Sequence, residues 1–282
     1  MPELPEVEIL VRYLRPLVVG KRIGKVSVHR PKSVRPISVS RMSGAVEGAK
    51  IIGLSRRAKY LLFDLQKNGG ETFLMLGHLG MTGRMYVQSA RKKLPKHAAV
   101  SFRIGRKVFV FEDTRYFGRL TLDTASLDLL GPEPLSKNFN GGTLYTALKR
   151  CKRAIKPKLL DQALLAGVGN IYAGEALWQA RISPRKMSRR LTRSQCDALA
   201  QSIVEVLSEA IELGSKVPLD FVGDEEGDGL FYYGSQGEED AYEERIMVYD
   251  REGEPCDRCV TPIRKIVQAA RSTYFCPKCQ SD

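Results

Sequence analysis

The chain has 282 residues, enough for two domains with hydrophobic cores, and carries 45 lysines and arginines against 32 aspartates and glutamates. It has no run of about 18 apolar residues, which argues against a membrane-spanning helix, and its charged first twenty residues do not resemble a secretory signal. Ten acidic residues and no basic residue lie between positions 220 and 244, so the rest of the chain is strongly basic. Such a surface attracts a polyanion with salt-dependent affinity; a merely solubilising charge is the alternative.

The first half of the chain is expected to be one helix followed by a β-sandwich. Apolar residues at helical spacing over residues 4–19 predict the helix, which Gly20 ends. The apolar period then changes to two, and turns containing glycine or asparagine separate short strands, which favours an antiparallel sandwich. Eight strands are expected: Ile23–Val28, Ala49–Leu54, Tyr60–Leu65, Thr72–Leu76, Met85–Gln88, Ala98–Ile104, Lys107–Phe111 and Arg119–Asp123.

The second half of the chain is expected to be mainly helical. Gly131-Pro132-Glu133-Pro134 ends the strand region and begins a linker. Thr192 or Ser194 could cap the last helix and Gly214 could end it. The candidate helices are Leu144–Lys149, Ile155–Leu160, Asn170–Ala180 and Arg193–Leu213. We therefore expect an N-terminal domain at 1–131, a linker at 132–142, a helical domain at 143–245 that includes an irregular acidic loop at 214–245, and a C-terminal module at 246–282.

The first eight residues, Met-Pro-Glu-Leu-Pro-Glu-Val-Glu, carry a chemical signal. The initiator methionine is usually removed before a small residue, which would leave a secondary amine at Pro2. An α-amine has a pKa of about 8, so part of it is free base at neutral pH and can attack an aldehydic carbon to form an iminium. Glu3 or Glu6 could move the protons. Alternatively, these residues only stiffen the chain start and favour a first helical turn.

Four cysteines near the C-terminus predict a structural zinc site. They form two Cys-x-x-Cys pairs that are sixteen residues apart, a spacing typical of four-cysteine zinc modules: Cys256, Cys259, Cys276 and Cys279. The stretch between the pairs is long enough for a β-hairpin. Two disulfides are the alternative, which the absence of any sign of secretion disfavours. The other cysteines, Cys151 and Cys196, are expected to be buried thiols.

Four short segments in the middle of the chain could bind phosphates. Lys59 opens a strand, His78–Gly83 is a glycine-rich loop with Met81 at its tip, Asp113–Gly118 puts an arginine and two aromatic residues on a turn, and Gly167–Asn170 precedes a helix that Asn170 could cap. Each has an ordinary structural alternative, such as a solvated lysine, a loop histidine or a core methionine. In one basic chain they together suggest a surface that grips a duplex and fills the gap left by an extruded base.

Seven motifs in order resemble bacterial formamidopyrimidine-DNA glycosylase over nearly the whole length: Met1–Glu8, Arg56–Leu61, His78–Gly83, Asp113–Gly118, Leu130–Leu135, Gly167–Tyr172 and Cys256–Cys279. The resemblance implies an α+β fold with an N-terminal antiparallel β-sandwich and flanking helix, a helix–two-turn–helix domain and a β-hairpin zinc finger. It also implies base excision repair, in which oxidised purines, notably 8-oxoguanine and formamidopyrimidines, are excised and the strand is cut by β,δ-elimination. The implied partner is damaged double-stranded DNA, bound by a monomer in the bacterial cytoplasm at the nucleoid.

The resemblance also assigns roles to single residues. Pro2 would attack C1′ of the damaged nucleotide and form a Schiff base, with Glu3 moving the proton at the sugar and Glu6 supporting it. Lys59 would contact a phosphate and transfer a proton during elimination, and Arg271 would grip phosphate and assist the δ step. Contacts to DNA are implied for seven residues, of which Met81, Arg115 and Phe117 would fill the void: His78, Met81, His97, Arg115, Phe117, Lys156 and Asn170. One structural zinc ion on Cys256, Cys259, Cys276 and Cys279 would order the hairpin that carries Arg271.

The chain departs from the family pattern at a few positions. Leu219 stands where relatives usually carry a cation, before an unusually long acidic loop. This departure affects the expected choice of damaged base more than the expected reaction. Thr114 and Tyr116 replace the commoner proline and arginine or lysine, and Cys151 stands where a basic DNA contact is often found. The endonuclease VIII group, a catalytically silent DNA-binding protein and a proline-amine tautomerase are rival interpretations. Leu4 argues against the first, the retained Pro2, Glu3 and Lys59 against the second, and the basic charge and cysteine pairs against the third.

Overall fold

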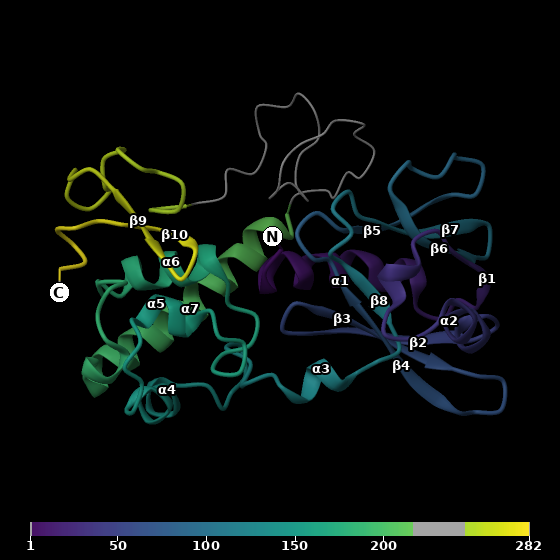
Figure 1. Ribbon diagram of the computed structural model, residues 1–282, viewed down its shortest axis with the longest axis horizontal. Helices are drawn as coiled ribbons and strands as arrows, with labels where there is room; N and C mark the ends of the chain where they lie inside the picture. The colour runs from purple at the N-terminus through teal and green to yellow at the C-terminus, as the bar shows by residue number, and fades with distance from the viewer. Residues whose placement is uncertain (1, 217–245, 282) are drawn as a thin grey trace. The chain divides into compact units, whose positions relative to one another are not determined.

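The computed structural model describes residues 2–216 and 246–281, which divide into two compact units (Figure 1). The first unit contains the chain up to Asp128 together with residues 214–216. The second contains Leu129–Leu213 and the residues after the gap. No helix in the described residues has the length and apolar character that crossing a membrane requires.

The first unit is an antiparallel β-sandwich with a helix beside it. Its elements are α1 (Leu4–Val18), β1 (Ile23–Val28), the 3-10 turn η1 (Pro31–Val34), α2 (Val39–Val46), β2 (Lys50–Arg57), β3 (Tyr60–Gln66), β4 (Thr72–His78), β5 (Arg84–Ser89), β6 (Ala98–Ile104), β7 (Lys107–Glu112), β8 (Arg119–Thr121) and α3 (Ala125–Asp128). One sheet has the order β1-β6-β7-β5 and the other β2-β3-β4-β8. All eight predicted strands are confirmed, and so is the first helix.

Alternating side chains explain how the two sheets pack. In β3, Leu61 and Phe63 are fully buried while Asp64 between Phe63 and Leu65 is exposed, because neighbouring residues of a strand face opposite sides. Phe63 meets Phe109 of β7 edge to face at 5.8 Å between ring centroids, and Phe109 stacks on Phe102 of β6 at 4.4 Å. These rings join the two sheets in one core, on which α1 packs through contacts with β2, β3 and β5.

Helix α2 was missed in the sequence. It has only eight residues, and its buried apolar anchors are Met42 and Val46, one turn apart. The helix begins at Ser38, whose hydroxyl accepts the backbone N–H of Arg41 at 3.2 Å. Two anchors and one cap are too short a pattern to separate a helix from a loop.

The second unit carries the four predicted helices and the predicted hairpin. Its elements are α4 (Gly141–Leu148), α5 (Ile155–Leu159), α6 (Asn170–Gln179), the 3-10 turn η2 (Ser188–Arg190), α7 (Arg193–Gly214), β9 (Arg264–Gln268) and β10 (Arg271–Phe275). Thr192 caps α7 as expected, since its hydroxyl accepts the backbone N–H of Gln195 at 3.2 Å. Helix α6 is buried almost throughout and contacts β10 (Figure 1).

Candidate active site and zinc module

The start of α1 places two buried carboxyl groups directly after Pro2. Glu3 is 2% exposed and Glu6 is 3% exposed, and Pro2 is buried beside them. The two glutamates form a capping box, in which the Glu6 carboxylate accepts the backbone N–H of Glu3 at 2.6 Å. The helix N-terminus favours negative charge at this position, which offsets part of the desolvation of the carboxylates. Pro2 and two buried carboxyl groups are thus fixed on one rigid helix end.

A strained turn between β2 and β3 presents Lys59. Ala58 lies in the left-handed region at φ 52°, which costs a residue with a Cβ about 1 kcal/mol, and Lys59 follows it at 7% exposure. Arg56 stabilises the turn, because its guanidinium donates hydrogen bonds to the Ala58 carbonyl at 3.0 Å and to the Glu8 carboxylate at 2.9 Å. Burial alone would raise the pKa of Glu8, but hydrogen bonds and charges from Arg56 and Arg12 outweigh it and lower that pKa. Arg56 therefore ties the Lys59 turn to α1.

His78 is the last residue of β4, and the glycine-rich loop that follows contains half-buried Met81. The His78 Nδ1 accepts the Gly80 backbone N–H at 3.1 Å, so the neutral ring carries its proton on Nε2 as a hydrogen-bond donor. Gly80 has φ +64°, and a Cβ there would lie 2.6 Å from the Gly118 nitrogen. This loop therefore lies directly against the turn Asp113–Gly118, which we name the wedge turn.

His78 is expected to stay neutral well below physiological pH. Burial, followed by the charges of Lys59 and Arg119, lowers its pKa from 6.5 to about 4. Because the folded protein favours the neutral ring, His78 contributes stability above pH 6.5, and that contribution is lost as the pH falls through about 4. An NMR titration of the His78 ring should give a midpoint of about 4 in the free protein. A midpoint near 6.5 would contradict this assignment.

Asp113 organises the wedge turn from inside. It is fully buried, and its carboxylate accepts the backbone N–H groups of Arg115 at 3.1 Å and Gly118 at 2.7 Å and the Thr82 hydroxyl at 2.6 Å. The Thr82 bond joins the turn to the Met81 loop. Arg115 and Phe117 project from this fixed base, and Phe117 keeps 54% of its surface exposed. Phe117 thus offers an apolar ring to solvent beside Arg115, and its insertion into DNA stays a prediction.

His97 contacts the same turn. Its Nδ1 lies 3.1 Å from the Tyr116 hydroxyl, and Tyr116 itself is in the left-handed region at φ 54°. The structure thus brings together, within the first unit, the loops and turns that carry Lys59, His78, Met81, His97 and the wedge turn.

In the second unit, Lys156 and Asn170 hold the strand that begins at Arg271. Lys156 is only 1% exposed, and its ammonium donates to the Ser272 carbonyl at 3.0 Å and the Thr273 hydroxyl at 3.1 Å. The Asn170 amide donates to the same Ser272 carbonyl at 3.1 Å. The expectation that Asn170 caps its helix is wrong, because Gly169 is the N-cap and Asn170 is the first helical residue. A DNA contact for Lys156 or Asn170 stays a prediction.

Arg271 follows a second strained turn. Ala269 and Ala270 both have positive φ, at 48° and 58°, in the two-residue turn between β9 and β10. Arg271 is exposed and pairs with Gln268 across the hairpin. Strain next to Lys59, in the wedge turn and before Arg271 indicates that the surrounding structure fixes these turns against their intrinsic preference.

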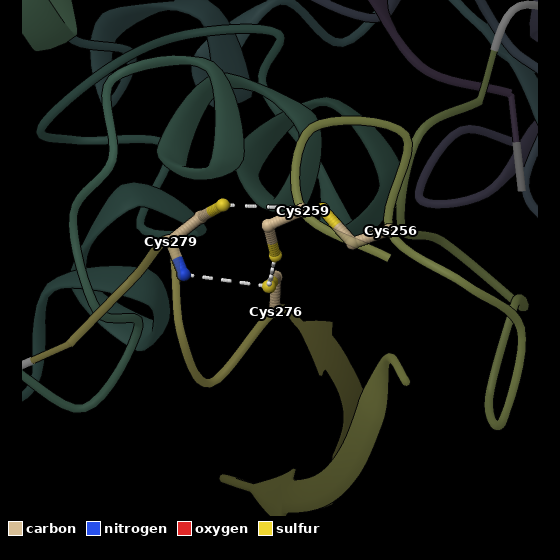
Figure 2. A group of neighbouring side chains, drawn as sticks. All are labelled: Cys256, Cys259, Cys276 and Cys279. Atoms are coloured by element: carbon tan, nitrogen blue, oxygen red, sulfur yellow. Dashed lines mark hydrogen bonds between the residues drawn. The ribbon is translucent and has the colours of Figure 1, made fainter. Parts of the chain in front are cut away.

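The predicted four-cysteine site is assembled in the structure. Figure 2 shows the four side chains converging, and their sulfur atoms all lie within 4.8 Å of one another. The Cys259 and Cys276 sulfurs are 3.4 Å apart and the Cys256 and Cys279 sulfurs 4.0 Å apart, which is too long for a disulfide. A zinc ion about 2.3 Å from four tetrahedral sulfurs separates them by about 3.8 Å, so the cluster fits one structural zinc ion.

Helix α6 anchors this zinc module, a role that the sequence interpretation missed. The carboxylate of Glu175 accepts the backbone N–H groups of Met247, Val248 and Tyr249 at 2.8, 3.1 and 2.8 Å. Burial raises the pKa of Glu175, and the three N–H donors oppose that rise. A lone carboxylate in an otherwise apolar helix is the sequence signal that indicates such an anchor.

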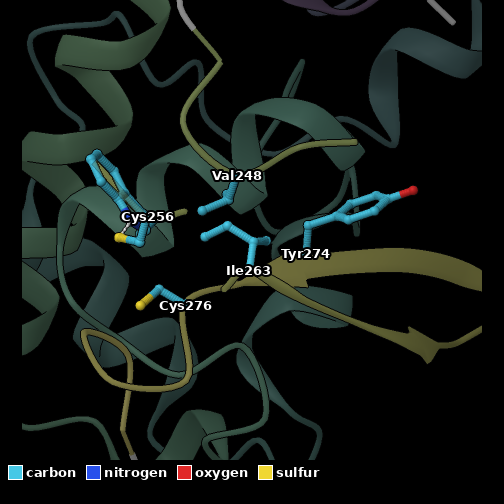
Figure 3. Packing of buried hydrophobic residues seen from close by; sticks show 6 residues of the cluster. Val248, Cys256, Ile263, Tyr274 and Cys276 are labelled. Carbon is cyan, nitrogen blue, oxygen red and sulfur yellow. Dashed lines mark hydrogen bonds between the residues drawn. The ribbon is translucent and has the colours of Figure 1, made fainter. Parts of the chain in front are cut away.

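The only tryptophan in the chain completes the anchor. The Trp178 indole N–H points to the Cys256 sulfur at 3.4 Å, and the Arg258 guanidinium lies 3.7 Å above the indole ring. Trp178 belongs to a buried cluster with residues of the module that Figure 3 shows: Val248, Cys256, Ile263, Tyr274 and Cys276. The module and α6 therefore share one core.

Cys196 is buried as expected and Cys151 is half-buried; Leu219 and the acidic residues 220–244 lie outside the described residues.

Comparisons with known proteins agree along the whole chain. Residues 1–120 match the formamidopyrimidine-DNA glycosylase N-terminal domain, residues 130–219 the H2TH domain of that enzyme, and residues 253–281 the zinc finger found in FPG and IleRS. The chain is 38% identical to formamidopyrimidine-DNA glycosylase of Desulfitobacterium hafniense, covering 99% of this chain and 100% of that protein. It is 39% identical to the enzyme of Thiobacillus denitrificans with the same coverage.

Solved structures give the same result. A Lactococcus lactis FPG mutant in complex with Fapy-dG DNA superimposes with a TM-score of 0.86 at 33% identity, covering 100% of both chains. MutM in complex with carbocyclic 8-oxo-G DNA gives the same score, identity and coverage. With these domains in this order and this identity over the full length, the chain belongs to the formamidopyrimidine-DNA glycosylase family of DNA-repair enzymes, and its four cysteines form the family's zinc finger.

Proposed function

We propose that this protein is a bifunctional DNA glycosylase and AP lyase that removes oxidised purines, 8-oxoguanine and formamidopyrimidines, from double-stranded DNA. It acts as a monomer in the bacterial cytoplasm, at the nucleoid. The observation that carries the proposal is the buried Glu3 and Glu6 pair directly after Pro2, on a helix that Arg56 ties to the Lys59 turn. The solved relatives with Fapy-dG DNA and 8-oxo-G DNA support this substrate class.

Base removal begins at the Pro2 nitrogen once Met1 has been cleaved off. The nitrogen lone pair attacks C1′ of the damaged nucleotide, the bond from C1′ to the base breaks, and the base leaves with the electron pair and takes up a proton. The amine loses its own proton, and the sugar ring opens as O4′ is protonated, which leaves an iminium between Pro2 and C1′. Glu3 moves the protons at the sugar, and Glu6 fixes Glu3 through its backbone N–H.

Strand cleavage follows from the same intermediate. The iminium acidifies the C2′ proton, whose loss expels the 3′ phosphate, and a second elimination expels the 5′ phosphate. Lys59 transfers protons in these steps, and Arg271 binds the departing phosphate. A zinc ion held by the four cysteines would order the hairpin that presents Arg271, and the chemistry itself uses the Pro2 amine and the chain's own side chains.

The other predicted residues hold the distorted duplex. Extruding a base costs a few kcal/mol, which contacts to phosphates and inserted side chains offset. Met81, Arg115 and Phe117 fill the space left by the base, and Phe117 is already exposed on the wedge turn. Contacts to the DNA backbone come from His78, Lys156 and Asn170, and His97 is a further DNA-binding residue.

A comparison of lesions tests this function. The protein is incubated in excess over duplexes that contain either 8-oxoguanine opposite cytosine or an oxidised pyrimidine, and the strand products are separated by length. The proposal expects cleavage mainly at 8-oxoguanine, with both sugar–phosphate bonds broken. Cleavage mainly at the pyrimidine would contradict the purine specificity, and binding without cleavage would contradict the enzymatic assignment.

A further inference from the structure

Arg30 lies beside the wedge turn although it comes from a distant part of the sequence. Its backbone N–H donates to the Ala99 carbonyl at 3.1 Å, at the start of β6, and its own carbonyl accepts the Ser33 N–H at 2.9 Å. The backbone of Arg30 is therefore fixed between β6 and η1. Its side chain is exposed, and the guanidinium carbon lies 4.7 Å from the centroid of the Tyr116 ring.

Tyr116 is held in place to receive this guanidinium. Its φ of 54° is unfavourable for an aromatic residue, its hydroxyl lies 3.1 Å from His97 Nδ1, and its carbonyl accepts a hydrogen bond from Arg119 at 3.3 Å. Arg119 thus holds the strained backbone at Tyr116, and His97 holds the far end of its ring. Such strain is maintained where a side chain must have one particular position.

The stack leaves the hydrogen-bonding edge of Arg30 available. A guanidinium on an aromatic ring uses its flat face, while its N–H donors lie in the plane and match two oxygens of a phosphate. The carboxylates at the start of the wedge turn and at the end of β7 are engaged elsewhere: Asp113 accepts the wedge turn's own N–H groups, and Glu112 accepts the Tyr86 hydroxyl at 2.7 Å. Arg115, also exposed, adds a second cation on the same turn.

We propose that Arg30, seated on Tyr116 and supported by His97, binds a backbone phosphate of the DNA into which the wedge turn inserts. Arg30 is an additional DNA-binding residue, and Tyr116 positions it. This inference rests on the proposed function, since it requires a DNA duplex as the ligand. The contact contributes to binding and register, and the reaction at C1′ does not use it.

The salt dependence of binding tests this contact. Fluorescence anisotropy measures affinity for a duplex with a tetrahydrofuran abasic analogue, which cannot be cleaved, over a series of KCl concentrations. Each neutralised phosphate contributes about 0.9 to the slope of log affinity against log salt, so Arg30→Gln should reduce that slope by about 0.9. It should weaken binding roughly 5- to 10-fold at the lowest salt.

Matched variants separate this role from general charge and from folding. Arg106→Gln removes an exposed arginine from the turn between β6 and β7 and should keep the wild-type slope. Tyr116→Phe keeps the ring but removes the hydroxyl that contacts His97, so its loss of slope should be smaller than that of Tyr116→Asn. Tyr116→Asn removes the ring and tolerates positive φ, so it should reproduce the Arg30→Gln loss with an unchanged unfolding midpoint. An unchanged slope in Arg30→Gln, or an equal loss in Arg106→Gln, would overturn the proposal. Wild-type protein that shows no salt-dependent DNA binding would instead overturn the proposed function together with it.

Discussion

Replacing Glu3 by glutamine is expected to reduce the single-turnover rate of 8-oxoguanine excision by about 100-fold or more, the range that a lost general acid–base group produces. The amide has nearly the shape of the carboxylate, so the capping of α1 should survive. Pro2→Gly should cause a loss of similar order, because it replaces the fixed secondary amine by a mobile primary amine. Both variants should unfold at the wild-type temperature.

Two milder variants serve as controls for this prediction. Glu6→Gln keeps an oxygen that can accept the Glu3 backbone N–H, so its excision rate should fall less than that of Glu3→Gln. Pro5→Ala changes a proline within the first helical turn and leaves Pro2 intact, so its rate should be close to wild type. Unchanged excision in both Pro2→Gly and Glu3→Gln would show that the chemistry occurs elsewhere.

Removal of zinc is expected to abolish tight DNA binding before the β-sandwich unfolds. The four thiolates hold the module that carries Arg271, whereas the first unit has its own core of Phe63, Phe102 and Phe109. Trp178 is 7% exposed and lies against Cys256, so its emission should shift to longer wavelength when a chelator removes the metal. DNA affinity should fall at the same chelator concentration.

The two units can be followed separately in this experiment. The only tryptophan reports the second unit, and the β-sheet signal in circular dichroism reports mainly the first. Cys276→Ala should behave like the chelated protein, while Cys151→Ser, which lies outside the cluster, should bind DNA normally. Loss of the β-sheet signal together with the tryptophan shift would contradict this division between the units.

Regular periodicity explains why most of the fold could be predicted. In β3 every second residue is buried, in β7 a short apolar run fills the strand, and in α1 the buried residues recur at helical spacing. The short elements α2 and α3 give no comparable signal, because α2 has only two buried anchors and the four-residue α3 has none. Periodicity is informative only where an element is long enough to repeat.

The candidate site could be predicted only in part. Pro2 and the cysteine pairs are visible because their chemistry depends on sequence position or spacing. The supporting contacts could not be predicted, because they join residues far apart in the sequence. Arg56 contacts Glu8, 48 residues away, and Glu175 contacts residues 247–249, 72 to 74 residues away. Arg30 contacts Tyr116, 86 residues away. Asn170 was misassigned as a cap because a glycine can also take the N-cap position, which frees the amide to bind Ser272.

Borohydride trapping on a duplex with 8-oxoguanine opposite cytosine tests the central claim most directly. Reduction converts the iminium into a stable bond between enzyme and DNA, and proteolysis with mass spectrometry then locates the linked residue. The account predicts an adduct on the peptide that begins at Pro2, and its loss when the N-terminal amine is blocked. Cleavage without an adduct, or an adduct on a lysine such as Lys59, would contradict it.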